Sequence, residues 1–133
     1  FIEHINDVDA LLVELVRVLE TGAIIEISVP HFSNPYFYSD PTHKATFGLY
    51  TFAYFFETKL FTRPIPNYSK IENAELVFVK LNFKSYRPNY IRHFMKKSFQ
   101  KVFNLNSWMQ EFYEEMLTSF MPCYEIIYRV QKK

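Results

Sequence analysis

Hydrophobic residues recur at helical spacing near the start of the chain and become almost continuous a few residues later. Between residues 8 and 19 six aliphatic side chains share one face of a helix: Val8, Leu11, Leu12, Leu15, Val18 and Leu19. Asn6 or Asp7 can cap this helix, and Gly22 offers a stop after it. Residues 23–29 then predict a strand whose apolar character is typical of a strand covered on both faces, as in a parallel sheet.

The remaining pattern predicts a long loop, two more strands and two more helices. Residues 31–45 are rich in Asn, Pro, Ser and Asp and indicate a loop, whereas residues 46–61 are strongly aromatic. Residues 75–84 alternate in the manner of a strand, and residues 124–130 predict a last strand. Residues 89–120 predict two helices broken near residues 104–106. This order predicts an α/β fold that ends in an antiparallel pair of strands and carries helices on the faces of the sheet.

Composition limits the chain to one domain and narrows the choice of partners. With 133 residues, 49% of them hydrophobic, the chain is long enough for a single core. The 15 basic and 14 acidic residues give a net charge of +1, which offers no cationic excess for nucleic acid. The one cysteine, Cys123, excludes an internal disulfide and is expected to be a small buried side chain. No apolar run reaches the roughly 18 residues of a membrane span, and we expect a cytoplasmic location.

Polar residues gather at the ends of two expected strands, one before the first helix and one formed by residues 23–29. Glu3-His4 precedes the first helix, and Val29-Pro30-His31 ends the first strand. Ligands of open α/β sheets bind beyond the carboxyl ends of parallel strands, so two such ends would bring His4 and His31 to one crevice. The loop after the strand adds further candidates: Tyr36, Tyr38, Asp40, Thr42, His43 and Lys44. Because histidine moves protons readily near neutral pH, this cluster predicts a catalytic site.

The first 31 residues resemble the C-terminal half of the Rossmann-like S-adenosylmethionine-dependent methyltransferases. The matching residues are Glu3-His4-Ile5, Asp7, Leu11, Glu14, Arg17-Val18-Leu19, Gly22 and Val29-Pro30. Many members of that superfamily show E-H-I after the fourth strand, then a helix ending R-V-L-K-P-G-G. Here the turn is Glu20-Thr21-Gly22-Ala23, without the usual K-P and second glycine. Residues 38–44 are also similar to one bacterial subgroup. The resemblance implies one partial methyltransferase domain, residues 1–133, carrying the C-terminal portion of a Rossmann-like sheet.

The resemblance also implies roles for individual residues. The implied activity is methyl transfer from S-adenosylmethionine to an unidentified acceptor. The Gly-rich loop that binds the cofactor lies on earlier strands of the family's fold. The cofactor would therefore be held by the complete domain. Residues 31–70 would form a loop and aromatic-rich insertion on the acceptor side. The cofactor side would include Phe1, Glu3 and His4. The catalytic candidates are His4, His31, Asp40 and His43, and the acceptor candidates are Tyr36, Tyr38 and Lys44. The chain begins with Phe1 rather than Met, which indicates processing or truncation.

Two other functions remain open. His31, Asp40 and His43 are suitable ligand types for zinc or non-haem iron, which would make the protein a metal-dependent enzyme. A half-domain without a cofactor loop can instead serve as a non-catalytic interaction module. Its exposed sheet edge would then be available for pairing, and homodimerisation through that edge would protect it from aggregation.

The second half of the chain contains a basic segment and an apolar stripe. Residues 92–97 together with Lys101 suggest a nucleic-acid or membrane surface, but Glu111, Glu114 and Glu115 are expected to cancel the field of these cations. A solvated helix face is therefore favoured. The following residues recur at helical spacing and predict a core-facing stripe: Trp108, Met109, Phe112, Met116 and Phe120.

Overall fold

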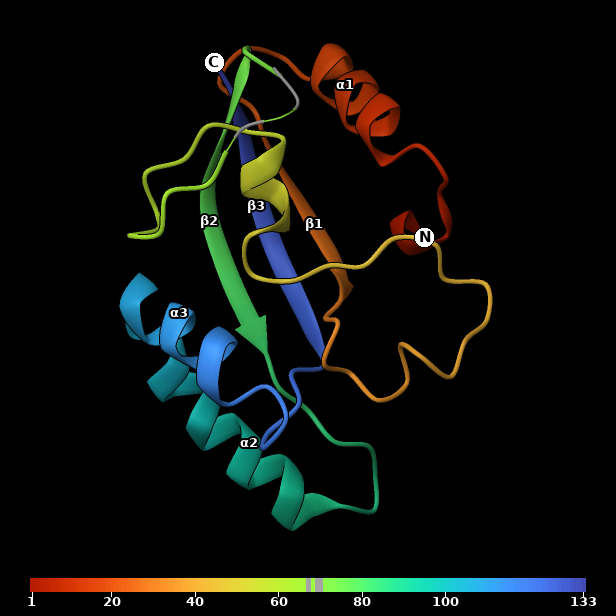
Figure 1. Ribbon diagram of the computed structural model, residues 1–133, viewed down its shortest axis with the longest axis vertical. Coiled ribbons are helices and arrows are strands. Elements are labelled where there is room, and N and C mark those ends of the chain that lie inside the picture. The colour runs from red at the N-terminus through yellow and green to blue at the C-terminus, as the bar shows by residue number, and fades with distance from the viewer. Residues whose placement is uncertain (67, 69–70) are drawn as a thin grey trace.

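The protein folds around one three-stranded sheet, and the computed structural model describes residues 1–66, 68 and 71–133. The strands are β1 (Ile24–Pro30), β2 (Ala74–Asn82) and β3 (Glu125–Lys132). Helix α1 (Val8–Val18) precedes β1, and α2 (Tyr90–Phe103) and α3 (Ser107–Met116) connect β2 to β3. Short 3₁₀ helices form at η1 (Ile2–His4) and η2 (Thr51–Tyr54). The predicted order of helix, strand, loop, strand, helices and strand is confirmed (Figure 1).

The sheet is antiparallel, so the predicted Rossmann-like sheet with a parallel strand is wrong. The strand order is β1-β3-β2, and β3 pairs antiparallel with both neighbours. The segment before α1 forms η1 rather than a strand end, which leaves β1 without a parallel neighbour in the described part of the chain. The α2–α3 hairpin then returns the chain so that β3 enters between the other two strands. The late antiparallel pair, β2 with β3, is as predicted.

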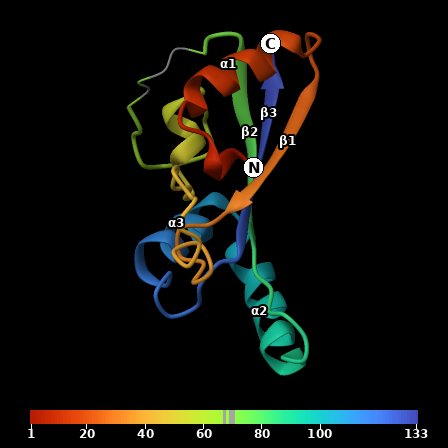
Figure 2. The ribbon, with the colours of Figure 1, turned by 90° about the vertical axis from the view of Figure 1, so that its right-hand side faces the viewer.

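Strand β1 is covered on one face only, contrary to its apolar sequence. Ile27 and Val29 are buried, whereas Glu26 and Ser28, which alternate with them, are exposed. Helices α1 and η2 lie on the buried side, and no helix of the described chain covers the opposite face (Figure 2). On that open face Arg129 binds Glu26 with an N···O distance of 2.7 Å. The alternation of burial is therefore that of an antiparallel sheet with one wet face.

Helix α1 begins as predicted and ends earlier than predicted. The Asp7 side chain accepts a hydrogen bond from the Ala10 N–H at 2.9 Å, which is the expected N-cap contact. The helix ends at Val18, and Leu19 is already extended. Gly22 therefore does not stop the helix. It takes a φ of +82° within the turn that leads into β1, a conformation that favours glycine.

A bulge in β2 changes which residues of this strand face the core. The register shifts between Leu76 and Phe78, so Leu76 is buried on the same face as Val79 and Leu81. The aromatic segment packs against this face. Phe52 of η2 stacks on Tyr128 of β3 with ring centroids 4.0 Å apart.

The two predicted helices after β2 are present, but the predicted core-facing stripe on the second one is wrong except for Met109, which packs against the core. Trp108, Phe112 and Met116 are exposed, as is Phe120 beyond α3. The buried residues of α3 are instead Gln110, Glu111 and Tyr113. Helical spacing identifies which side chains share a face, whereas the partners available on the sheet decide which face turns inward.

Candidate functional site

Two segments far apart in the sequence meet beyond the end of β1. The backbone N–H groups of Lys44 and Ala45 both donate to the carbonyl oxygen of Glu3, at N···O distances of 2.7 and 3.1 Å. The rings of His4 and His43 consequently lie 4.8 Å apart between centroids. The loop after β1 is thus folded back onto η1, and the predicted residues Glu3, His4 and His43 lie side by side.

Asp40 orders the loop that carries His43. One carboxylate oxygen accepts hydrogen bonds from the Thr42 hydroxyl at 2.6 Å and from the Thr42 N–H at 2.9 Å. These bonds hold the pKa of Asp40 below its ordinary value. The other oxygen lies 3.5 Å from Nε2 of His43. An anionic carboxylate therefore stands beside the imidazole at neutral pH.

The hydrogen bonds of the two histidines determine which ring nitrogen carries the proton. Nδ1 of His43 lies 2.8 Å from the carbonyl oxygen of Phe37, and Nδ1 of His4 lies 3.2 Å from that of Thr42. Because a carbonyl oxygen only accepts, each Nδ1 must donate. In the neutral form of each ring, Nε2 is therefore the atom with the free lone pair. Both Nε2 atoms can accept a proton or bind a metal ion.

A crevice opens next to His43 at this end of the sheet. A cavity of about 300 Å³ is lined by Glu3, Pro30, Asn34, Tyr36, Phe37 and His43, and by Tyr124 and Glu125 where β3 begins. A second cavity of about 240 Å³ shares Asn34, Tyr36 and Tyr124 with the first and extends to α2. Sites of this kind, in which apolar walls carry a few converging polar groups, are typical of small-molecule binding.

The walls of the crevice are held by contacts that sequence patterns did not indicate. Asn34 is buried, donates to the carbonyl oxygen of Tyr124 at 2.8 Å and accepts from the Tyr36 N–H at 2.9 Å. The hydroxyl groups of Tyr86 and Tyr124 are hydrogen-bonded to each other. Burial, together with Tyr86, raises the pKa of Tyr124 to about 12. Its phenol therefore stays protonated at neutral pH.

The remaining predicted residues lie around the crevice. Tyr36 lines both cavities. The side chains of Tyr38 and Lys44 are exposed, and neither lines either cavity. Phe1 is also exposed and lies beside Glu3 at the start of η1.

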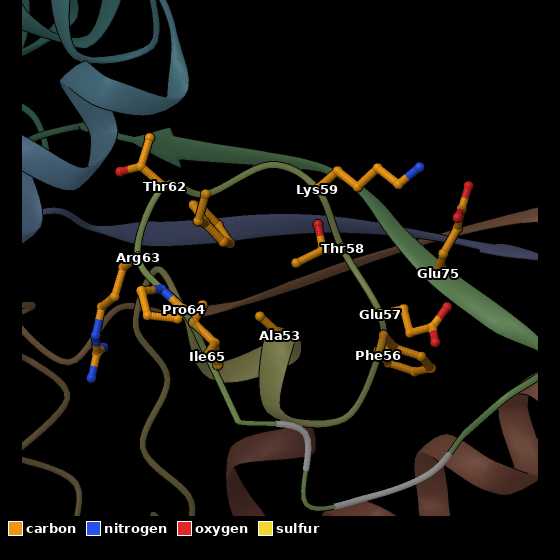
Figure 3. A pocket seen from close by; sticks show the side chains of 11 residues that line it. Ala53, Phe56, Glu57, Thr58, Lys59, Thr62, Arg63, Pro64, Ile65 and Glu75 are labelled. Carbon is orange, nitrogen blue, oxygen red and sulfur yellow. The ribbon is translucent and has the colours of Figure 1, made fainter.

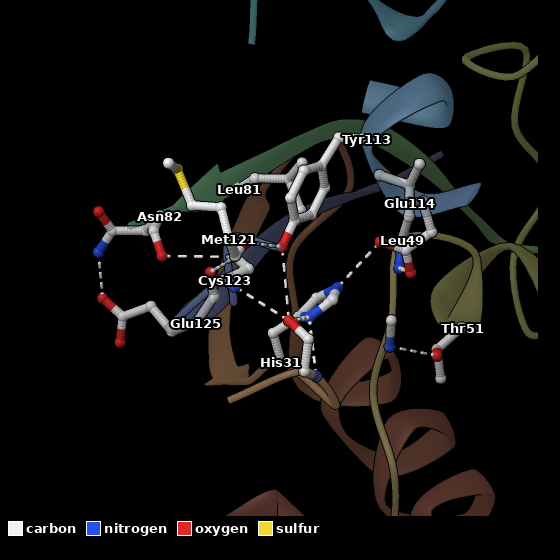
Figure 4. Close-up of polar contacts among 12 residues, drawn as sticks. His31, Leu49, Thr51, Leu81, Asn82, Tyr113, Glu114, Met121, Cys123 and Glu125 are labelled. Atoms are coloured by element: carbon white, nitrogen blue, oxygen red, sulfur yellow. Dashed lines mark hydrogen bonds and ion pairs between the residues drawn. The ribbon is translucent and has the colours of Figure 1, made fainter. Parts of the chain in front are cut away.

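His31 lies apart from this cluster, in a buried polar network (Figure 4). Its side chain is fully buried, and Nε2 lies 2.9 Å from a carboxylate oxygen of Glu114. Nδ1 accepts from the Ser33 N–H at 3.1 Å, so Nε2 carries the hydrogen that is donated to Glu114. His31 makes no hydrogen bond, ion pair or ring contact with His4, Asp40 or His43. The structure thus separates one predicted catalytic histidine from the other two.

Another hollow lies elsewhere, within the aromatic-rich segment (Figure 3). It measures about 520 Å³, and the loop of residues 56–65 curves around it. Its lining includes Ala53, Phe56 and Ile65 together with charged side chains such as Glu57 and Arg63. None of the predicted site residues lines this hollow.

Three residues of the cluster have the composition of a metal site. One ligand atom from each of Glu3, His4 and His43 lies within 4.8 Å of the others. Metal-bound histidines commonly donate the other ring N–H to a carbonyl, as His4 and His43 do here. The metal ligands suggested by the sequence were His31, Asp40 and His43. His31 is not part of the present group, because it is buried and paired with Glu114.

No protein-family model, curated protein or solved structure matches this chain. Among the described residues, no helix has both the length and the apolar character needed to cross a bilayer. The function must therefore be inferred from the residues of the site and their chemistry.

Proposed function

We propose that the crevice at the end of β1 is the acceptor side of an S-adenosylmethionine-dependent methyltransferase, and that His43 is its general base. One observation carries the proposal: His43 lines a cavity, its Nδ1–H is held by the Phe37 carbonyl, and its Nε2, 3.5 Å from the Asp40 carboxylate, can accept a proton. The match of Glu3-His4-Ile5 and of residues 38–44 to the family supports the reaction type. The antiparallel sheet gives no support, so the proposal depends on the site and on this sequence match.

The protein's tasks in such a reaction are alignment and proton removal. The methyl donor, when bound, supplies an electrophilic methyl group on a sulfonium. The acceptor must be held in line with that group and must lose a proton as it attacks. His43 Nε2 takes this proton, and the Asp40 carboxylate, 3.5 Å away, stabilises the resulting imidazolium. The rings of Tyr36 and Tyr124 wall the crevice and limit the access of water.

Glu3 suits the charge of the donor's methionine part. Its side chain is only 13% exposed and lines the 300 Å³ cavity together with His43. In this structure the carboxylate pairs with the Phe1 ammonium at 2.8 Å, and the α-ammonium group of the donor can take the same charge-assisted contact in its place. His4 and Phe1 flank this position on η1. Glu3, His4 and Phe1 thus fit the cofactor side of the proposed site.

Calorimetric titration of the intact protein with S-adenosylmethionine tests the proposal. Binding is expected, and Glu3→Gln should weaken it at least about tenfold through loss of a charge-assisted contact. Glu14→Gln is the matched control, because Glu14 is exposed on α1 and pairs only with Arg17. Absence of binding by the intact protein would contradict the proposal and favour the non-catalytic interaction module.

A metal-dependent function is the second candidate, and the Glu3, His4 and His43 group is the observation that favours it. Zinc or iron(II) bound there would keep open positions for a substrate, as in catalytic sites with three protein ligands. Zinc titration of the intact protein distinguishes the two functions. Tight binding that is lost in both His4→Ala and His43→Ala supports the metal site, and unchanged zinc affinity in these variants excludes it.

A further inference from the structure

Helix α2 presents an exposed apolar stripe that no described part of the protein covers. Ile91 is 79% exposed, Phe94 is 74% exposed and Leu105, just after the helix, is 71% exposed. Further members of the stripe are Tyr90, Met95, Phe99 and Val102. By helical spacing these residues of α2 spread over the face opposite to His93 and Gln100, which accept hydrogen bonds from the Ser85 and Phe83 N–H groups, and Phe99 at the edge of the stripe stacks on the buried Phe103. The helix thus turns its larger apolar surface toward the solvent.

Cations border this stripe on both sides. By helical spacing, Arg92 and Lys96 lie along one border, and Lys97 and Lys101 lie along the other. Lys96 and Lys97 bend back toward the sheet, where they donate to the Lys84 carbonyl and to the Asn82 side chain. Arg92 and Lys101 are exposed. Residues 84–110 contain no Asp or Glu, so α2 itself carries no acidic side chain.

Two of the three acidic residues of α3 bind partners that lie outside α2. Glu111 is buried and accepts hydrogen bonds from Thr62 and Arg63. Glu114 is turned inward toward His31 and the Leu49 N–H. Glu115 remains exposed. Two of the three glutamates that were expected to cancel the basic field thus direct their carboxylates to partners outside α2, and the cancellation itself stays a prediction.

We propose that α2 is a membrane-surface helix that lies flat on a bilayer rich in anionic lipids. An amphipathic helix with low overall hydrophobicity, an apolar face and bordering Lys and Arg residues is typical of interfacial binding. The apolar stripe would enter the boundary between headgroups and acyl chains, while Arg92 and Lys101 would contact lipid phosphates.

Two other occupants fit this surface less well. Single-stranded RNA would match the cations and the aromatic rings, but Ile91, Met95 and Val102 offer it no stacking surface. A second copy of the chain would match the apolar stripe, but a two-fold contact would bring two cationic borders together. A bilayer with anionic headgroups satisfies both the apolar and the charged groups.

Co-sedimentation of the intact protein with phosphatidylcholine vesicles, with and without phosphatidylglycerol, tests the proposal. Binding to the phosphatidylglycerol vesicles should exceed binding to pure phosphatidylcholine and should weaken as salt is raised. The double variant Ile91→Ser/Phe94→Ser should reduce binding at least about tenfold, and Lys101→Gln about fivefold. Neither variant touches the crevice or a buried side chain, so circular dichroism should show an unchanged fold.

Matched controls lie on α1. Val18→Ser and Arg17→Gln also change an exposed valine and an exposed arginine, and they should leave vesicle binding unchanged. The proposal is overturned if anionic vesicles do not bind the protein, or if the α1 and α2 variants lower binding equally. It is also overturned if polyuridylate binds while vesicles do not, or if Ile91→Ser/Phe94→Ser only converts an oligomer to a monomer.

Discussion

Nε2 of His31 lies 2.9 Å from a carboxylate oxygen of Glu114, and this contact joins the end of β1 to α3. The second carboxylate oxygen of Glu114 accepts from the Leu49 N–H at 2.7 Å. The second ring nitrogen of His31 is bound to Ser33. Both groups are thus fully engaged within the protein, which favours a structural role for this pair and leaves His43 as the histidine exposed to the crevice.

The first prediction concerns the carboxylate of Glu114. Glu114→Ala leaves the His31 and Leu49 N–H groups buried without an acceptor, so the free energy of unfolding should fall by about 3 kcal/mol. Urea denaturation followed by circular dichroism measures this loss. Glu115→Ala, which changes an exposed glutamate on the same helix, should cost less than about 0.5 kcal/mol. Equal losses in the two variants would contradict a structural role for the His31–Glu114 pair.

Gly48 provides a second prediction because it leaves room for the same carboxylate. A Cβ atom at position 48 would lie 2.7 Å from Oε1 of Glu114 and 3.0 Å from Cδ1 of Phe32. Gly48→Ala should therefore lower the free energy of unfolding by about 1–3 kcal/mol. In the Glu114→Ala background the loss should shrink by about 1 kcal/mol, since the two positions are in contact.

Gly22→Ala is the control for this double-mutant cycle. Gly22 has a φ of +82° and nothing within 4 Å of an added Cβ, so its cost of roughly 1 kcal/mol comes from the backbone alone. It should add to the Glu114→Ala loss without coupling. If Gly22→Ala couples with Glu114→Ala, or if Gly48→Ala does not, then steric contact with the Glu114 carboxylate is not the cause of the stability lost in Gly48→Ala.

Local signals in the sequence were sufficient to predict the three α-helices and the three strands, but not η1. Asp7 caps α1, and Asn106 caps α3 through a hydrogen bond from the Met109 N–H, so the predicted break between the last two helices is confirmed. The pairing of strands could not be predicted in this way. Whether β1 has a parallel or an antiparallel neighbour depends on a contact between residues about 100 positions apart, such as Ile27 with Tyr128, and not on local spacing.

The candidate site was predictable by residue type and not by arrangement. Glu3, His4 and His43 could be selected because carboxylates and imidazoles move protons. Their convergence depends on backbone hydrogen bonds to the Glu3 carbonyl, which any residue at positions 44 and 45 can donate except proline. The inward turn of Glu111 likewise follows from donors in a distant loop.

A third prediction concerns Asn104, whose side chain pairs with the edge of β2 as a neighbouring strand would. Its Oδ1 accepts from the Leu81 N–H at 2.9 Å, and its Nδ2 donates to the Leu81 carbonyl at 2.7 Å. Asn104→Ala should cost about 2–3 kcal/mol and should remove hydrogen-exchange protection at the Leu81 amide. Asn106→Ala removes only the cap of α3, so it should cost about 1 kcal/mol and keep that protection. Retained protection in Asn104→Ala would contradict the pairing.

The last prediction is the pH dependence that Glu111 confers on stability. Burial by itself raises the pKa of Glu111, but hydrogen bonds from Thr62 and Arg63 outweigh it and bring the pKa below the ordinary value of 4.5. A carboxyl group with a lowered pKa in the folded state stabilises the protein fully above its unfolded pKa. That contribution is lost as the pH falls through the folded pKa. The free energy of unfolding of the wild type should therefore decrease from about pH 5 downward.

Glu111→Gln should be less stable at neutral pH by about 1–2 kcal/mol, and its free energy of unfolding should decrease less on acidification. Urea denaturation across this pH range measures both slopes, with Glu115→Gln as the exposed control. Equal slopes for the wild type and Glu111→Gln would show that the Thr62 and Arg63 contacts do not favour the ionised form.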